Sequence, residues 1–220
     1  MPELTQQDAV HVLDLGGDEN RFSLEWLKNT HALLDTLAEG TEPAVLVTTG
    51  TGKFYSNGLD LEWLLAHGDQ AGQYVNDVQE LFARVLTLPV PTVAAINGHA
   101  FGAGAMLAMA HDFRVMRADR GYFCFPEADI NIPFTPGMAA LIQGKLTPAA
   151  AIASMTTGRR FGGPAARELG LVDDIAGEAE LLEHASGLVR ELAGKDRGTL
   201  GAIKATMFAT AVTALRQAGA

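Results

Sequence analysis

Two kinds of apolar pattern alternate along the first part of the chain. Short runs in which most positions are apolar predict buried strands, and longer runs with apolar residues three or four positions apart predict amphipathic helices. The predicted strands cover residues 10–15, 44–48, 92–96, 113–116 and 122–125. The predicted helices are one that follows a Ser23 cap and those over residues 59–65 and 70–88. This repeated alternation of strand and helix predicts an α/β fold.

The second half of the chain is predicted to be rich in helices. Three helix starts are expected where a proline occupies the first helical position, at Pro136, Pro148 and Pro164, the first two after a threonine cap. No low-complexity linker and no fixed-period repeat divides the sequence. We therefore predict one core over residues 1–194 and a helical C-terminal appendage over residues 195–220.

The composition narrows the class of function. Hydrophobic residues make up 48% of the 220 residues, which is enough for one sizeable core. The net charge is −10 with only 16 Lys and Arg, which excludes a nucleic-acid-binding protein because phosphate contacts need massed cations. Cys124 is the single cysteine, so no internal disulfide and no cysteine metal site is expected, and a reducing cytoplasm is the predicted location.

Neither a membrane span nor a secretory signal is predicted. Residues 85–110 contain no charged side chain, but Pro89, Pro91 and Asn97 interrupt them. They therefore predict a buried strand followed by a buried helix. Residues 1–20 lack the basic region and the apolar block of a signal peptide.

The most informative segment reads NGHAFGAGAMLAMAHD and covers residues 97–112. Gly102, Ala103 and Gly104 let a ligand approach the backbone, and the apolar run after them predicts a helix whose free N–H groups favour negative charge. Glu127, in FCFPEADI, is the candidate for proton transfer. Asp129 competes with it, because in an extended segment both side chains lie on the same side.

Three segments, in order along the chain, resemble those of the crotonase, or enoyl-CoA hydratase/isomerase, superfamily. They are KFYSNGLDL at 53–61, PTVAAINGHAFGAGAMLAMAHD at 91–112 and TTGRRFGGPAARELGLVDDI at 156–175. The details SNGLDLEW, RADRGYF and PEADI are most similar to the plant-peroxisomal type of delta3,delta2-enoyl-CoA isomerase. The resemblance implies a crotonase-like spiral of ββα units, a homotrimer or a dimer of trimers, and an acyl-CoA thioester as substrate.

The resemblance also implies a set of site residues. The backbone N–H groups of Leu59 and Ala103 match the pair that receives the thioester oxygen. Glu127 matches the second of the two glutamates of family hydratases, and Met106 stands at the first. The implied substrate-binding and CoA-binding positions are Lys53, Ser56, Asn57, Gly58, Asp60, Gly102, Met106, Phe134 and Lys204.

A single glutamate favours isomerisation, because a thioether such as Met106 cannot accept and return a proton. The expected reaction moves a 3,4 double bond of a fatty acyl-CoA to the trans-2,3 position, with Glu127 as the proton shuttle. An apolar wall of Met106, Phe123, Phe125 and Phe134 is expected to raise the pKa of Glu127. The alternatives are 2-enoyl-CoA hydration or another crotonase reaction, and a non-catalytic acyl-CoA-binding subunit.

The remaining expectations concern CoA, metals and turns. Lys53 and Lys204 are the candidate cations for the CoA phosphates, Lys204 by its resemblance to a family position on the C-terminal helix. CoA enters as part of the substrate, and no other cofactor is expected. His99 and His111 lack metal-ligand spacing, so no metal is expected, and Ser56 is expected to form a turn. The sequence lacks a Ser-Lys-Leu peroxisomal address, which also favours the cytoplasm.

Overall fold

The computed structural model describes residues 1–217, and its largest sheet contains six strands. The strand order is β1–β2–β4–β7–β9–β11; β1 is antiparallel to β2, and every other pair is parallel. Parallel strands need a crossover between them, and helices supply it here. The bounds are β1 (Glu3–Gln7), β2 (Val10–Asp14), β4 (Val45–Thr49), β7 (Thr92–Ile96), β9 (Phe113–Arg117) and β11 (Asp174–Ala176).

Each of the three central strands of this sheet is followed by a short strand that lies outside it. The followers of β4, β7 and β9 are β5 (Phe54–Ser56), β8 (His99–Phe101) and β10 (Phe123–Cys124), which form their own sheet in the order β10–β8–β5. A two-stranded ladder joins β3 (Arg21–Phe22) to β6 (Gly58–Leu59). This repeated strand, strand and helix agrees with the predicted ββα units.

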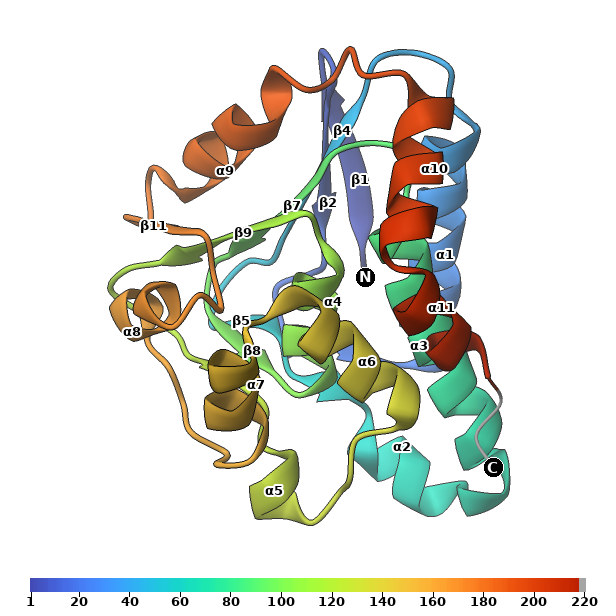
Figure 1. The fold of residues 1–220 in the computed structure, drawn as a ribbon, viewed down its shortest axis with the longest axis vertical. Coiled ribbons are helices and arrows are strands. Elements are labelled where there is room, and N and C mark those ends of the chain that lie inside the picture. Colours follow the sequence, from blue (N-terminus) through green and yellow to red (C-terminus); the bar gives the residue numbers. More distant parts are fainter. Residues whose placement is uncertain (218–220) are drawn as a thin grey trace.

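Helices complete each unit and continue to Arg216. They are α1 (Leu24–Glu39), α2 (Leu61–Ala66), α3 (Ala71–Leu86), α4 (Ala103–Ala110), α5 (Glu127–Ile130), α6 (Pro136–Lys145), α7 (Pro148–Met155), α8 (Gly163–Glu168), α9 (Leu181–Arg190), α10 (Arg197–Met207) and α11 (Ala209–Arg216). A 3-10 turn, η1 (Gly68–Gln70), precedes α3. Figure 1 shows them around the sheet, with α2 and α5 at the lower end of the molecule.

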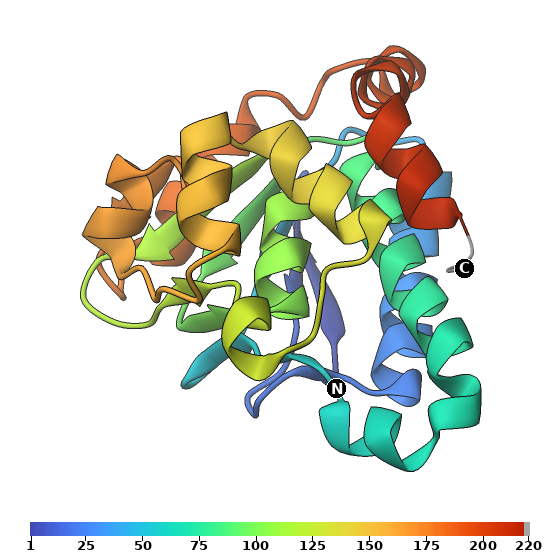
Figure 2. The ribbon, with the colours of Figure 1, turned by 60° about the horizontal axis from the view of Figure 1, so that its bottom comes forward.

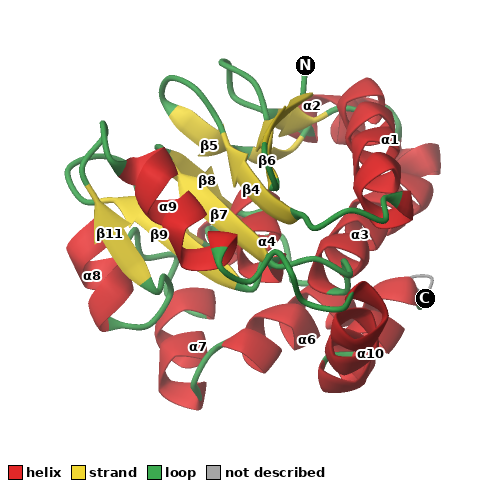
Figure 3. Cartoon of the chain, turned by 90° about the horizontal axis from the view of Figure 1, so that it is seen from above, coloured by secondary structure: helices red, strands yellow, loops and turns green. Residues whose placement is uncertain are grey.

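Helices cover both faces of the large sheet. One face packs valines of β4, β7 and β9 against Leu181, Ala185 and Val189 of α9, which lies across the strands in Figure 3. The opposite face packs against α1, α3 and α4 in the larger core. All eight residues of α4 are buried, and Figure 2 shows this helix in the middle of the molecule.

Most of the predicted elements are confirmed. The five predicted strands appear as β2, β4, β7, β9 and β10, and the predicted helices over 59–65 and 70–88 appear as α2 and α3. Ser23 caps α1 as expected, because its Oγ accepts the Trp26 N–H at 3.2 Å. The threonines before Pro136 and Pro148 cap α6 and α7 in the same way. The predicted elements omit the polar edge strand β1 and several strands of two or three residues.

Helix α10 is tied to the amino ends of the central strands by a buried lysine. The Nζ of Lys204 donates to Asp112 Oδ2 at 2.6 Å and to the Val90 carbonyl at 2.7 Å, and only 4% of its side chain is exposed. The expectation that Lys204 binds CoA phosphates is therefore corrected within this subunit. The amine is buried, and its charge is already paired with the Asp112 carboxylate.

The C-terminal segment is helical, as expected, and α11 packs on α3 and α6. The division of the chain at residue 195 stays a prediction, and residues 218–220 of the predicted appendage lie outside the described residues. Within residues 1–217, no single helix is long and apolar enough to cross a bilayer. The pair α10–α11 passes that test only when joined, across a bend of 75°.

Replacing Lys204 by methionine should destabilise the fold. The Asp112 carboxylate would lose its cation in a largely buried place, which typically costs about 3–5 kcal/mol. Urea unfolding measures the change, with Lys195→Met as the control because Lys195 is exposed and should change stability by less than about 0.5 kcal/mol. Equal stability of the two variants would contradict the assigned role of Lys204.

Candidate active site

Segments that follow the carboxyl ends of β4, β7 and β9 meet around one cavity of about 210 Å³. Ligands of parallel sheets commonly bind beyond the carboxyl ends of the strands. The structure brings Asn57, Leu59, Gly102, Ala103 and Glu127 together on this cavity, as predicted from the sequence. The complete lining is Arg21, Asn57, Leu59, Leu61, Phe101, Gly102, Ala103, Pro126, Glu127, Ile130 and Ile132.

The start of α4 presents a free backbone N–H to the cavity. Gly102 has φ +52° and ψ −122° and turns the chain from β8 into the helix. The first helical N–H that bonds back is that of Met106, which donates to the Gly102 carbonyl at 3.0 Å. Among the described residues, the N–H of Ala103 has no acceptor. It is therefore available to an anionic oxygen.

The second predicted donor segment lies directly beside this helix start. Ser56 forms the expected turn, because its Oγ accepts the Gly58 N–H at 3.0 Å and donates to the Asn20 carbonyl at 2.8 Å. A Cβ added at Gly58 would lie 2.9 Å from the Ala103 nitrogen, so the two backbones are in contact. The next residue, Leu59, lines the cavity and pairs with Phe22 in the β3–β6 ladder.

Glu127 is a buried acid with an unused oxygen. Only 8% of the residue is exposed, and among the described residues its Oε2 has no hydrogen-bond partner. A Cβ added at Gly102 would lie 3.4 Å from its Oε1, which places the carboxylate beside the turn into α4. Burial raises the pKa of Glu127 to about 7, although its own backbone N–H opposes the shift. A group with that pKa can both take up and release a proton near neutral pH.

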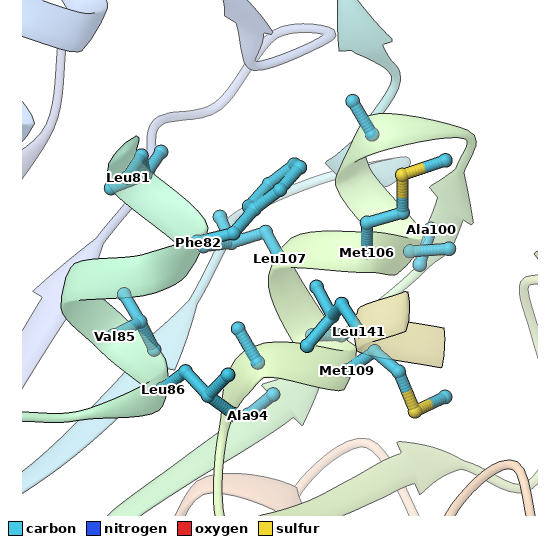
Figure 4. Close-up of a cluster of buried hydrophobic side chains, with 14 of the residues drawn as sticks. Leu81, Phe82, Val85, Leu86, Ala94, Ala100, Met106, Leu107, Met109 and Leu141 are labelled. Atoms are coloured by element: carbon cyan, nitrogen blue, oxygen red, sulfur yellow. The ribbon is translucent and has the colours of Figure 1, made fainter. Parts of the chain in front are cut away.

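The apolar wall of the cavity differs from the one expected. Leu61, Phe101, Ile130 and Ile132 line it together with Pro126 and Leu59. Of the four residues expected there, Met106, Phe123 and Phe125 belong to the core, and Phe134 packs against the Phe125 ring at 6.1 Å. Figure 4 shows Met106 on α4 beside Ala100, among core side chains. The residues that line the cavity beside Glu127 are therefore not the four that were expected.

The difference has a local cause. The segment after Pro126 is a single helical turn, α5, where an extended segment was expected. Ile130 N–H donates to the Pro126 carbonyl at 3.1 Å, and Asn131 then adopts a left-handed conformation with φ +57°. This turn directs Asp129 away from Glu127, so that its carboxylate lies against Gly158. Asp129 is exposed and does not line the cavity.

Some predicted residues support the site from outside the cavity lining. Asp60 caps α2 by accepting the Trp63 N–H at 3.2 Å, and its own N–H donates to the Tyr74 hydroxyl at 2.9 Å. Lys53 is exposed, with its Nζ 5.2 Å from the Phe54 ring centroid. Neither Asp60 nor Lys53 lines the cavity, and Lys204 lies near the opposite, amino ends of the strands.

Arg21 is the one cation on the cavity among the described residues, and the sequence analysis missed it. Its Nε is 2.5 Å from Glu19 Oε2, and hydrogen bonding to Glu19 raises its pKa. Arg21 reaches the cavity because β3 pairs with β6, which places it opposite Gly58. No sequence signal links these segments, since 36 residues separate them and each strand has only two.

The histidines near α4 have structural roles. His111 is buried; its Nδ1–H donates to the Leu107 carbonyl at 2.8 Å, its Nε2 lies 3.0 Å from the Thr48 hydroxyl oxygen, and burial lowers its pKa to about 4. His99 stacks on the Tyr122 ring at 5.5 Å. Within residues 1–217 no group of three or more His, Cys, Asp or Glu side chains is placed to hold a metal ion.

The fold and site define an α/β protein in which one buried acid faces the free N–H of a helix start. That arrangement suits an anion that forms beside a proton-transfer group. The sequence matches the enoyl-CoA hydratase/isomerase family over residues 5–219, and the chain belongs to that family. The predicted superfamily and its fold are thereby confirmed.

The relatives include enzymes named as isomerases and a structure named as a hydratase. Enoyl-CoA delta isomerase 3 of Arabidopsis thaliana is 37% identical, with 89% of this chain and 86% of the relative covered. Enoyl-CoA delta isomerase 2, peroxisomal, of the same plant is 36% identical, with 82% and 79% covered. The structure of a probable enoyl-CoA hydratase from Mycobacterium tuberculosis superposes with a TM-score of 0.89 at 27% identity, covering 99% of this chain and 92% of that one.

The buried carboxyl group should make stability fall with rising pH. The pKa of Glu127 is about 7 when folded against an ordinary 4.5, so between these values the folded chain holds a proton that the unfolded chain releases. The contribution of Glu127 is therefore full below pH 4.5 and is lost as pH rises through 7. Glu127→Gln removes this loss, so the variant should exceed the wild type by about 2–3 kcal/mol at pH 8.

Urea unfolding at pH 4 and pH 8 measures this difference. At pH 4 the Glu127 carboxyl is mostly neutral in both states, so the two proteins should have nearly equal stability. A wild type that is more stable than the variant at pH 8 would contradict the assigned burial.

Proposed function

We propose that the chain is an enoyl-CoA isomerase that moves a 3,4 double bond of a fatty acyl-CoA to the trans-2,3 position. The observation that carries the proposal is the buried Glu127 carboxylate, which is the single acid on the cavity among the described residues. The hydration pattern of the family uses two acids, and the first of those positions holds Met106, a core residue here. The Arabidopsis relatives named as delta isomerases support the same reaction.

In the proposed reaction Glu127 removes a proton from C2 of the 3-enoyl thioester. The electrons of that C–H bond form the new C2–C3 double bond by way of a dienolate, whose charge rests on the thioester oxygen. Glu127 then returns the proton at C4, so no atom is gained or lost. The raised pKa supports both halves of this shuttle, because the carboxyl group changes charge easily near neutral pH.

The dienolate oxygen is proposed to accept the N–H groups of Ala103 and Leu59. The free N–H of Ala103 at the start of α4 supports this role, and the contact of Gly58 with Ala103 keeps Leu59 within the same cavity wall. One such donor typically contributes about 2.7–4 kcal/mol to the transition state. The apolar side chains around the cavity limit water at the dienolate.

Hydration of 2-enoyl-CoA is the second candidate, because the Mycobacterium tuberculosis structure is named as a probable hydratase. It would require Glu127 alone to place and activate water. The two reactions differ in mass, since hydration adds one water to the product and isomerisation adds none.

The proposal extends to binding, assembly and location. Lys53 is exposed beside the first donor segment, which supports a contact with the CoA phosphates, and CoA in the substrate is the only cofactor that the reaction needs. The proposal that the chain forms a homotrimer or a dimer of trimers rests on the family resemblance. The cytoplasmic location rests on the sequence, while two of the plant relatives are named as peroxisomal.

Glu127→Gln should abolish isomerisation while acyl-CoA still binds. Loss of the general base should lower kcat by about 10²–10⁴-fold, whereas the amide keeps nearly the same shape. The measurement follows trans-3-decenoyl-CoA and trans-2-decenoyl-CoA by chromatography and mass, with Asp129→Asn as the matched control. Water gain from the 2-enoyl substrate without double-bond migration from the other would assign a hydratase. Binding with no turnover in the wild type would assign a non-catalytic subunit.

The pH profile gives a further prediction. Glu127 must be ionised to remove the first proton, so kcat/KM should rise with pH through about 7 and level off above it. Initial rates between pH 5 and 9 with 3-decenoyl-CoA measure the profile. A rate that is already constant from pH 5 upward would contradict a base of this pKa.

A further inference from the structure

A second cavity, larger than that at Glu127, lies at the amino ends of the central strands. Its volume is about 540 Å³, against about 210 Å³ for the Glu127 cavity, and it falls in the range of small-molecule sites. Apolar side chains of α10 and its junction with α11 dominate one wall, among them Leu200, Ile203, Met207 and Phe208. Ile203 and Met207 are 49% and 68% exposed, so this wall is open in the single subunit.

Lys145, the last residue of α6, lies on this cavity without a carboxylate of its own. Around it are two carboxylates, Asp112 and Asp173, and two further cations, Lys204 and Arg114. Lys204 holds Asp112 at 2.6 Å and Arg114 holds Asp173 at 3.0 Å. Within residues 1–217, Lys145 forms no ion pair and no side-chain hydrogen bond.

The Lys145 amine lies over an aromatic ring. Its Nζ lies 4.9 Å from the centroid of Phe208. The pKa of Lys145 is lowered to about 8, first by burial and then by the charges of Arg114 and Lys204, while Asp112 and Asp173 oppose the shift. An ordinary lysine titrates near ~10.4, so Lys145 is neutral, and therefore nucleophilic, in a much larger fraction of molecules at pH 8.

We propose that Lys145 is a site of N-acylation by acyl thioesters, with the acyl chain held in the cavity along α10. The lone pair of Nζ attacks the thioester carbonyl, the C–N bond forms and the C–S bond breaks. CoA leaves as the thiol after taking up the proton that the amine releases. The product is an N-acyl-lysine, with no oxidant, reductant or further reactant.

Two features of the cavity favour an acyl thioester as the reactant. The lining of Leu200, Ile203 and Met207 suits a medium-length alkyl chain. Lys195 is exposed on the same cavity and supplies a cation for CoA phosphates, while the neighbouring Asp196 is engaged as the cap of α10. The proposal rests on the proposed function only in taking acyl-CoA as a molecule that this protein meets.

The experiment incubates the whole protein with decanoyl-CoA or acetyl-CoA and measures the acylation of each lysine by peptide mass spectrometry. Decanoyl-CoA has no double bond, so Glu127 cannot convert it. Lys145 should react about tenfold or more faster with decanoyl-CoA than with acetyl-CoA, because the cavity holds the longer chain near the amine. The remote Lys28 is the internal control and should show no such preference.

Two variants distinguish the effect of acyl-chain binding in the cavity from the general reactivity of lysine amines. Met207→Glu places a charge on the exposed wall and should remove the preference for decanoyl-CoA while acetylation of Lys145 continues. Lys145→Arg should leave the labelling of Lys195 unchanged. The Glu127→Gln variant should acylate at Lys145 like the wild type, so failure of the isomerase proposal and failure of this one are distinguishable.

The proposal is overturned by equal labelling of Lys145 and Lys28, or by the absence of any chain-length preference at Lys145. It is also overturned if Lys145 reacts poorly and its acylation falls still further as the protein concentration rises. That result would assign the cavity to a second copy of the chain. Acylation of Lys145 whose rate levels off above about pH 8 would support it, since the amine is then already neutral.

Discussion

The candidate site depends on how closely helix α4 approaches the segment between β5 and β6. A Cβ at Gly104 would lie 2.3 Å from the Ser56 carbonyl oxygen, and one at Gly58 would lie 2.9 Å from the Ala103 nitrogen. Neither distance is sterically possible, so the two segments meet backbone to backbone. This contact places the free N–H of Ala103 and residue Leu59 on one wall. Any side chain at the contact would separate them.

Burying the Glu127 carboxyl group destabilises the fold, and the packing of the surrounding core offsets this cost. Its Oε2 has no partner among the described residues, and burying an unpaired polar group is unfavourable. The eight buried residues of α4 and the apolar cavity wall surround this end of the sheet, so the carboxyl group cannot move into solvent without disturbing packed residues. The raised pKa follows from the same burial, because the neutral form of the acid is the less costly one.

The features predicted correctly from the sequence are those that depend on residues close together along the chain. The caps at Ser23, Thr135 and Thr147 and the buried strands were found because capping and apolar periodicity act over a few residues. The positions of Leu59, Ala103 and Glu127 on one cavity came from the family resemblance.

What the sequence did not predict depends on distant pairing. Arg21 reaches the cavity only through the ladder between β3 and β6. Lys204 was assigned to CoA from the family resemblance, and nothing local in the sequence shows that Asp112, 92 residues earlier, holds its amine. The turn after Pro126 replaced the expected extended segment, and the wall changed with it, since Ile130 and Ile132 follow Glu127 in that turn.

Burial shifts the pKa of one titratable group at each end of the central strands, and the two shifts have opposite directions. At the carboxyl ends burial raises the pKa of an acid, Glu127, and at the amino ends it lowers the pKa of a base, Lys145. The shifts persist because neither group forms an ion pair within residues 1–217: Glu127 Oε2 has no hydrogen-bond partner there, and Lys145 is the third cation beside two carboxylates. Both groups therefore exchange protons near neutral pH. Glu127 can give its proton back to carbon and remain unchanged, whereas an amide at Lys145 would keep the acyl group.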